Sequence, residues 1–362
     1  MAHNNLRDTS VLPREERPAY DRNAQLSMGR FRAEASYDGT AYNGFGTQVL
    51  PFCGIQDVLE ACLSKVFGGR VYVAGCGRTD AGVHARHYVF HFEPPVELFE
   101  NRKDGKPLAP HLAAAMKAGD QEKVALALEQ MCKSHASTSL LPADIHVTNF
   151  RPVDTLFHAR EMCTGKRYVY SVHEGAGCPL SSRYRWVLGK GKTLDISNMR
   201  EAAALLIGKH DFSTFGLMVA GDPRSPVKYM RRLDVTRTVT NLSTGDRTID
   251  TPNSSLSRKR SLNGEHCAEN ILGRGCDDDV ESVVTITAEC DRFLFNMMRL
   301  ISGTLVQVGR GLLSVGEFEE LFCARGGRPH KGNCQVVKAP AKGLCLHRCF
   351  YAEDGPDSVF GP

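Results

Sequence analysis

Apolar and polar residues alternate along several short stretches of the first half of the chain. Residues 30–35 alternate as a β-strand does, and the turn-forming segment Tyr37-Asp38-Gly39-Thr40 follows them. Residues 55–67 carry one apolar stripe over three turns, which predicts a helix. The pattern predicts further strands at 71–74 and 87–92.

The second half of the chain shows the same alternation of strand-like and helix-like patterns. Its elements are predicted as strands at 166–173, 233–239, 283–290 and 343–351, and as helices at 122–132, 195–207 and 293–308. Because strands and helices alternate in both halves, we expect an α+β or α/β protein with a large central sheet.

Several segments are too polar to form part of a core. From the residues and from the resemblance described below, we expect a disordered arm at 1–28, an N-terminal catalytic half at 29–150 with an insertion at 96–122, a C-terminal half at 151–352 with a disordered insertion at 241–280, and a tail at 353–362.

Composition restricts the location of the protein more than its function. The 362 residues carry a net charge of +4, which by itself is weak evidence for a nucleic-acid partner. There is no run of about 18 apolar residues, so no membrane span is expected. The first 28 residues lack the apolar core of a signal peptide and contain acidic residues. We expect a cytoplasmic or nuclear protein, with an organelle still possible.

The cysteines indicate a reducing compartment. There are 13 of them, an odd number, and none forms a CxxC pair. A C-terminal group could suggest zinc: Cys323, Cys334, Cys345 and Cys349, with His330 and His347. Zinc ligands usually come in close pairs, and the only close pair here stands in a strand-like stretch. We therefore interpret these residues as buried or half-buried thiols and expect no metal.

The most informative segment is Gly75-Cys76-Gly77-Arg78-Thr79-Asp80-Ala81-Gly82-Val83-His84-Ala85. Three glycines surround an arginine and an aspartate, and glycine permits tight turns and close approach of a ligand. Taken without context, such a string is most often a turn in which the aspartate caps the next segment. The spacing also differs from that of a dinucleotide-binding loop.

This segment resembles the active-site loop of the TruA family of tRNA pseudouridine synthases, whose pattern is G-x-G-R-T-D-x-G-V-H-A. Further matches run from about residue 30 to residue 351 in the family's order. They are Tyr37-Asp38-Gly39-Thr40, Leu141-Pro142-x-Asp144-Ile145, Phe157-His158-Ala159-Arg160, Lys166-Arg167-Tyr168-x-Tyr170, His210-Asp211-Phe212-x-x-Phe215, Phe293-Leu294-Phe295-Asn296-Met297-Met298-Arg299 and Ala339-Pro340-Ala341-Lys342-Gly343-Leu344.

Two departures from the family pattern stand out. Gly44-Phe45-Gly46 occupies the place of the usual Gly-Trp-Gln, in a region near the RNA path. Met298 occupies the place of a usual valine. The resemblance implies two ferredoxin-like halves that share a continuous, mostly antiparallel central sheet flanked by helices, which is the pseudouridine synthase fold.

The resemblance also implies a role for each site residue. Asp80 is the catalytic carboxylate, and Arg299 pairs with it and keeps it ionised. Tyr168 packs against the target base, Leu344 lines the uracil pocket, and Arg78 helps to hold the target nucleotide out of the stack. His84, by contrast, is interpreted as part of the loop's structure.

The implied reaction converts uridine to pseudouridine in tRNA, at uridines on the 3′ side of the anticodon stem-loop. A carboxylate can act in it as nucleophile on the sugar or as base at C2′, and the sequence leaves both open. No cofactor is expected, because there is no net redox change or group transfer. The implied partners are tRNA and a second copy of the chain, without a membrane. Two alternatives remain: the same chemistry on messenger or small nuclear RNA, and a catalytically silent RNA-binding module.

Overall fold

The computed structural model places two compact units, and each is described by itself. It describes residues 29–94, 108–133, 140–216, 225–251, 280–323 and 336–360. Unit 1 consists of residues 1–164 and 346–355, and unit 2 of residues 165–345 and 356–362. The predicted arm at 1–28 lies outside the described residues.

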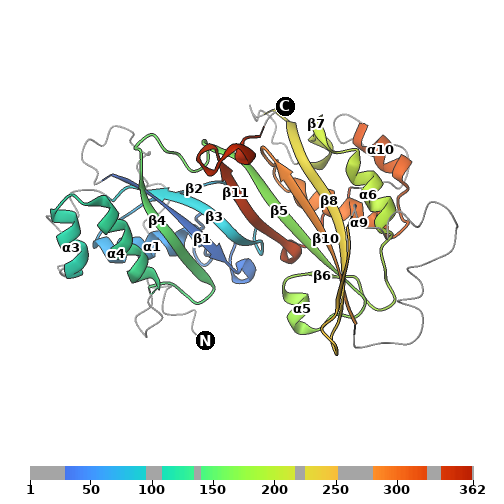
Figure 1. Ribbon diagram of the computed structural model, residues 1–362, viewed down its shortest axis with the longest axis horizontal. Helices are drawn as coiled ribbons and strands as arrows, with labels where there is room; N and C mark the ends of the chain where they lie inside the picture. The colour runs from blue at the N-terminus through green and yellow to red at the C-terminus, as the bar shows by residue number, and fades with distance from the viewer. Residues whose placement is uncertain are drawn as a thin grey trace. The chain divides into compact units, whose positions relative to one another are not determined.

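Unit 1 is an antiparallel sheet with helices (Figure 1). Its elements in chain order are β1 (Arg30–Tyr37), α1 (Ile55–Phe67), β2 (Val73–Gly75), β3 (His84–Phe92), α3 (Pro110–Lys117), α4 (Gln121–Lys133), β4 (Ile145–Val153) and most of β11 (Leu344–Tyr351). The strand order is β4-β1-β3-β11, and β2 pairs with β3. β1 is antiparallel to both β3 and β4, which makes it an interior strand of this sheet.

The alternation along β1 produces the core of unit 1. Phe31, Ala33 and Ala35 are buried, and the Phe31 ring stacks on Phe92 of β3 at a centroid distance of 5.7 Å. The apolar stripe of α1 is buried as its spacing predicts. Gly68, at φ +73°, ends this helix in the left-handed conformation that glycine adopts most easily.

Unit 2 repeats the combination of antiparallel strands and helices. It contains most of β5 (Cys163–Glu174), then α5 (Pro179–Arg183), β6 (Trp186–Val187), α6 (Ile196–Ala204), β7 (Gly208–Asp211), β8 (Val227–Asn241), β9 (Arg247–Asp250), β10 (Val280–Cys290), α9 (Met297–Gly309) and α10 (Val315–Cys323). The strand order is β5-β10-β8-β7, with β9 on β8. Only the short pair β5–β6 is parallel among the pairs of this unit for which a register is described.

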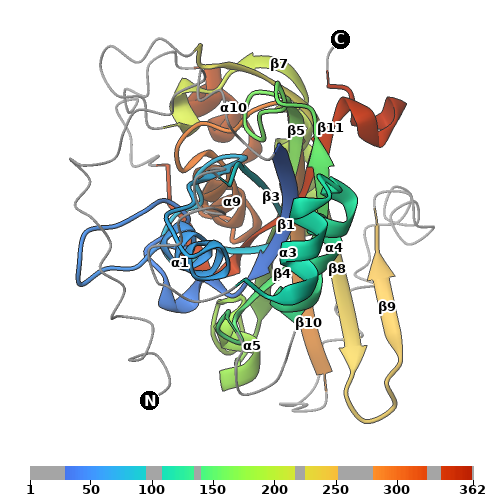
Figure 2. The ribbon, with the colours of Figure 1, turned by 90° about the vertical axis from the view of Figure 1, so that its left-hand side faces the viewer.

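The helices of unit 2 form one group. α6 packs on β8 and α9, and α10 packs on α6 and α9 (Figure 1). Figure 2 shows β9 beside β8 in the same unit. Asp195 caps α6 as predicted, since its carboxylate accepts a hydrogen bond from the Asn198 amide. α9 begins at Met297 and not at Phe293 as predicted, because Asn296 is in the left-handed conformation at φ +61°.

The predicted fold class is confirmed: strands and helices mix in both units, and the pairing is mostly antiparallel. The units differ from the predicted halves 29–150 and 151–352 because the last strand, β11, pairs with β3 of unit 1. The described part of the predicted insertion at 96–122 contains α3 and the start of α4. Within the predicted insertion at 241–280, β9 is an ordered strand; residues 252–279 lie outside the described residues.

Within the part of the chain that the structure describes, no helix combines the length and apolar character needed to cross a membrane.

Candidate active site

Asp80 stands on the tight loop between β2 and β3 of unit 1. The Val83 amide donates a hydrogen bond of 3.2 Å to the Asp80 carbonyl, and this closes a turn around the aspartate. Gly82 in this turn has φ +76°, a conformation that favours glycine. Asp80 is half-buried and Arg78 is exposed, so both residues can be reached from outside the unit.

The last residue of β1 and the segment that follows it support this loop from one side. The Tyr37 hydroxyl lies 2.9 Å from the Thr79 Oγ1 atom, next to Asp80 in the chain. The Phe45 amide donates to the Thr79 carbonyl at 3.1 Å, and the Gly82 amide donates to the Tyr42 carbonyl at 3.2 Å. These three hydrogen bonds therefore hold Thr79 and Gly82, which lie on either side of Asp80.

An aromatic pair supports the loop from below. The Tyr88 hydroxyl on β3 donates to the Gly77 carbonyl, and the Phe45 ring stacks on the Tyr88 ring at a centroid distance of 4.0 Å. Burial raises the pKa of Tyr88, which keeps the hydroxyl protonated as a donor. Phe45 is only 2% exposed. Its departure from the family's tryptophan therefore concerns packing under the loop and not a surface on the RNA path.

His84 connects the loop to the Tyr37-Asp38-Gly39-Thr40 turn. Its Nδ1 atom lies 3.1 Å from the Gly39 amide nitrogen and 3.1 Å from an Asp38 carboxylate oxygen. Its side chain is buried. This position fits the interpretation of His84 as a residue of the loop's structure.

Arg299 of unit 2 is held in place by the segment before β11. Its Nε atom donates to the Ala339 carbonyl at 2.9 Å, and the Ala339 amide donates back to the Arg299 carbonyl at 3.0 Å. The Nη1 atom also lies 3.4 Å from the Asn296 side-chain oxygen. These contacts fix the direction in which the guanidinium leaves α9.

The same segment contacts Tyr170 near Arg299 and leads into Leu344. The Tyr170 hydroxyl donates to the Pro340 carbonyl at 2.8 Å, next to the residue that Arg299 binds. Burial raises the pKa of Tyr170, and the positive charge of Arg299 partly opposes this effect. Leu344 follows as the first residue of β11 and is 6% exposed.

Tyr168 lies on the same face of β5 as Tyr170, two residues earlier. Tyr168 is 7% exposed, and its ring meets the Phe293 ring edge-on at a centroid distance of 4.9 Å. Unit 2 thus holds Tyr168, Arg299 and Leu344, and unit 1 holds Arg78 and Asp80.

Sequence reasoning missed the residues that support the loop. Tyr37 stands in a quoted motif, but its bond to Thr79 joins positions 42 residues apart. Tyr88 had no sequence signal beyond strand alternation, although its hydroxyl reaches Gly77. Contacts of this kind depend on strand register, which local patterns do not contain.

The described residues include no group of three or more His, Cys, Asp or Glu side chains placed to hold a metal ion. In the C-terminal cysteine group, Cys345 is half-buried, Cys349 is buried and Cys323 is exposed. Cys334 and His330 lie outside the described residues.

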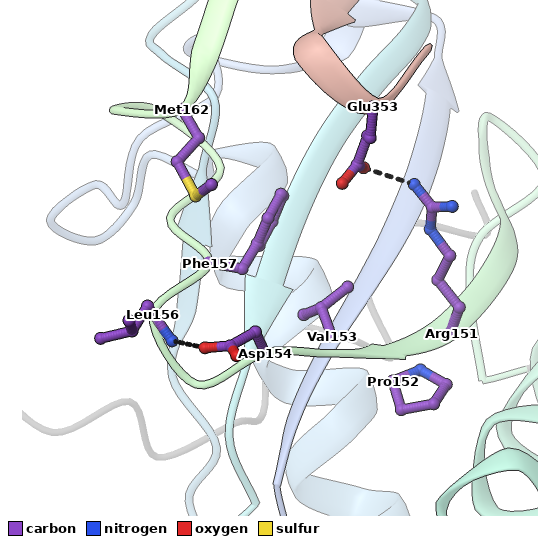
Figure 3. Close-up of a pocket in the computed structure, with 8 residues that line it drawn as sticks. All are labelled: Arg151, Pro152, Val153, Asp154, Leu156, Phe157, Met162 and Glu353. Carbon is purple, nitrogen blue, oxygen red and sulfur yellow. Dashed lines mark hydrogen bonds and ion pairs between the residues drawn. The ribbon is translucent and has the colours of Figure 1, made fainter. Parts of the chain in front are cut away.

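A pocket of about 470 Å³ lies elsewhere on unit 1 (Figure 3). Arg151 and Glu353 form an ion pair of 2.7 Å on one side of it, and the largely exposed Leu156 lies on the other. None of the five candidate residues lines this pocket. It is therefore separate from the loop that carries Asp80.

Comparison with known proteins identifies the family of this chain. A family model described as tRNA pseudouridine synthase matches residues 202–352. The chain is 30% identical to "tRNA pseudouridine synthase A" of Syntrophotalea carbinolica over 90% of its own length and 97% of the relative's. It is 30% identical to "tRNA pseudouridine synthase A 2" of Clostridium perfringens, over 90% of this chain and 100% of the relative. It is 31% identical to "tRNA pseudouridine synthase A" of Solidesulfovibrio magneticus, over 91% of this chain and 93% of the relative.

The fold, the loop and these relatives define the class of protein as an RNA-modifying isomerase. The chain belongs to the tRNA pseudouridine synthase family.

Proposed function

We propose that this protein isomerises uridine to pseudouridine in tRNA, with Asp80 as the catalytic carboxylate. The observation that supports this most strongly is the rigid, glycine-rich loop that presents a half-buried aspartate within the family's active-site motif. Bonds from Phe45 and Val83 hold the backbone around that aspartate, so its carboxylate can meet a sugar in a fixed geometry.

The reaction breaks the N1–C1′ bond of uridine, turns the base, and joins C5 to C1′. The proton on C5 is lost and N1 gains one, so atoms and electrons balance without a cofactor. Asp80 acts either as the nucleophile at C1′ or as the base at C2′. Both routes need an ionised carboxylate next to the ribose.

Arg299 is the second part of the proposal, as the cation that pairs with Asp80. This pairing rests on the family motif. Support comes from unit 2, where Ala339 binds both the Nε atom and the carbonyl of Arg299 and so orients its guanidinium. A fixed guanidinium gives a carboxylate a directed, charge-assisted partner.

Tyr168 and Leu344 complete the proposal as the residues that contact the uracil, and Arg78 as the one that holds the nucleotide out of its stack. Tyr168 and Leu344 are mostly buried, so each can present an apolar surface to the base in unit 2. Arg78 is exposed beside Asp80, where a guanidinium can reach a phosphate or stack on a base.

The proposal includes a target, a partner and a compartment. The target is a uridine on the 3′ side of the anticodon stem-loop of tRNA, and the protein works as a homodimer in the cytoplasm. Free thiols at Cys62, Cys132 and Cys290 fit a reducing compartment. Carbodiimide mapping of tRNA after incubation with the enzyme tests the target, and modification only in another RNA class would contradict it.

The substitution Asp80→Asn tests the chemistry. Asparagine keeps the shape but can neither attack a sugar carbon nor take its proton, so we expect the rate to fall by several orders of magnitude. RNA binding should remain or improve slightly, because a negative charge facing phosphates is removed. The rate is measured as tritium release from 5-tritiated uridine in tRNA, and binding by filter retention.

Asp120→Asn is the matched control, because Asp120 is a half-buried carboxylate of the same unit whose hydrogen bond and ion pair with Lys123 lie at the start of α4. Its rate should equal that of the wild type. If Asp80→Asn binds tRNA and releases tritium at nearly the wild-type rate, the assignment of Asp80 is wrong.

A further inference from the structure

Three large apolar side chains are exposed together on one loop of unit 1. Val49 is 70% exposed, Leu50 68% and Phe52 57%, within the segment of residues 47–53 that precedes α1. We call Val49, Leu50 and Phe52 the apolar tip. Apolar side chains grouped in this way on a surface usually mark a place where something binds.

Both ends of this loop are attached to the catalytic loop or to the residues that hold it. Phe45, just before it, donates its amide to the Thr79 carbonyl beside Asp80. Ile55, just after it, donates to the carbonyl of Gly44. At Gly46 a Cβ atom would lie 3.7 Å from the Arg78 Nε atom, so the Arg78 side chain passes the base of the loop. The tip thus continues the surface on which the target nucleotide would lie.

The loop is held in one conformation. One carboxylate oxygen of Asp57, in the first turn of α1, accepts from the Gln48 amide at 3.0 Å and from the Gly54 amide at 2.9 Å. It therefore ties the two ends together. At the tip the Phe52 amide donates to the Val49 carbonyl at 3.0 Å, which closes a turn. A pre-ordered loop loses little entropy when a ligand binds, so its exposed side chains can contribute to affinity.

The chemistry of the tip selects for bases over phosphates. Residues 47–53 include no lysine or arginine, so they offer no cation for a phosphate. Unpaired bases of RNA, by contrast, stack on aromatic and apolar side chains. A uridine can be isomerised only after it leaves its stack, and its neighbours then lose a stacking partner. An apolar surface beside the catalytic loop can replace that partner.

We propose that the apolar tip binds unpaired bases next to the target uridine, with Phe52 as the main stacking side chain. This inference rests on the proposed function, because it takes RNA as the substrate of the Asp80 loop.

Binding and turnover of tRNA by Phe52→Ala and Leu50→Ala variants test the proposal. Loss of one stacked base corresponds to a rise in Kd of about fivefold to a hundredfold for Phe52→Ala, and a smaller rise for Leu50→Ala. The turnover number at saturating tRNA should stay near wild type, because the bonds around Asp80 do not involve the tip. The salt dependence of binding should keep its slope, since no charge is removed.

Leu242→Ala is the matched control, since Leu242 is 59% exposed on unit 2. Its Kd should equal that of the wild type. A wild-type Kd for Phe52→Ala would overturn the proposal. An equal loss of turnover at saturating tRNA would also overturn it, because the loop would then act only as a support for Asp80.

A tryptophan at the tip reports stacking directly. The chain has a single tryptophan, Trp186, so Phe52→Trp in a Trp186→Phe background places the only indole on the loop. We expect tRNA to quench its fluorescence, and a duplex RNA without unpaired bases to quench it much less. Equal quenching by both RNAs, or none by tRNA, would refute the proposal.

The remaining outcomes separate this inference from the proposed function. If the wild type releases no tritium from tRNA, the proposed function fails, and quenching of Phe52→Trp by tRNA still decides the inference. If the tip instead joins two copies of the chain, sedimentation would show a wild-type dimer that Phe52→Ala converts to monomer without tRNA, and the inference would be wrong.

Discussion

Gly44 offers a sharp test of the idea that the segment after β1 positions Asp80. It has φ +91°, and a Cβ atom placed on it would lie 2.4 Å from the Thr79 carbonyl oxygen. Ordinary contact begins at about 3.4 Å, so in Gly44→Ala the Thr79 carbonyl must move by roughly 1 Å. Thr79 precedes Asp80, and the movement therefore passes to the Asp80 carboxylate, the proposed catalytic group.

The expected size of the effect follows from this displacement. A misplacement of about 1 Å at a reacting group can lower a rate about a hundredfold. The positive φ adds a cost of about 1–2 kcal/mol to the folded state, because alanine adopts it poorly. We therefore expect Gly44→Ala to reduce the turnover number about a hundredfold and to lower the free energy of unfolding by more than about 1 kcal/mol.

Gly119→Ala separates the two effects. Gly119 in unit 1 also has a positive φ, +67°, but a Cβ atom there would meet nothing within 4 Å. This variant should lose about 1–2 kcal/mol of stability and keep its turnover number. Stability is measured by denaturant unfolding and turnover by tritium release. A Gly44→Ala enzyme with near wild-type turnover would refute the positioning argument, as would an equal loss of turnover in Gly119→Ala.

Three further predictions concern the charged and titratable groups. Arg299→Ala should lose most of its turnover. Arg299→Lys should recover little of it, because lysine lacks the planar guanidinium that can bind the Ala339 carbonyl and a carboxylate at the same time. Tritium release checks both variants, and full activity of the alanine variant would exclude a role for Arg299. Burial, with the nearby charge of Arg30, lowers the pKa of His91 to about 3. Between pH 3 and about pH 6.5 the unfolded chain therefore binds a proton that the folded chain does not, and the free energy of unfolding rises with pH. Unfolding measured from pH 7 down to pH 4 should show His91→Gln with a slope smaller by up to about 1.4 kcal/mol per pH unit, and an unchanged slope would contradict this assignment. Activity should survive dialysis against EDTA when the tRNA is kept folded, and a loss that only zinc restores would contradict a metal-free reaction.

The local pattern of the chain predicted most of its elements. The strand at residues 30–35, the helix at 55–67 and the cap at Asp195 are found as predicted. Each depends on side chains close together in the sequence, where alternation, helical spacing and capping act directly. The predicted start of α9 was wrong, because the sequence at 293–296 does not indicate that Asn296 takes the left-handed conformation.

The candidate site likewise has a part that the sequence predicted and a part that it did not. The motif marked Asp80 and its neighbours because glycines and charged residues occur there in a specific order along the chain. The sequence by itself therefore determined the class of chemistry and the fold class. It did not indicate what holds the loop still, nor that Phe45 packs beneath it.

Only the tertiary structure decided those points. The bond of Tyr37 to Thr79, the contact of Tyr88 with Gly77 and the pairing of β11 with β3 join residues that local patterns treat as unrelated. Each depends on the register and order of strands, which are set by packing of the whole sheet. The exposed tip at Phe52 belongs with them, because exposure of an apolar side chain is a property of the folded surface and not of the residue.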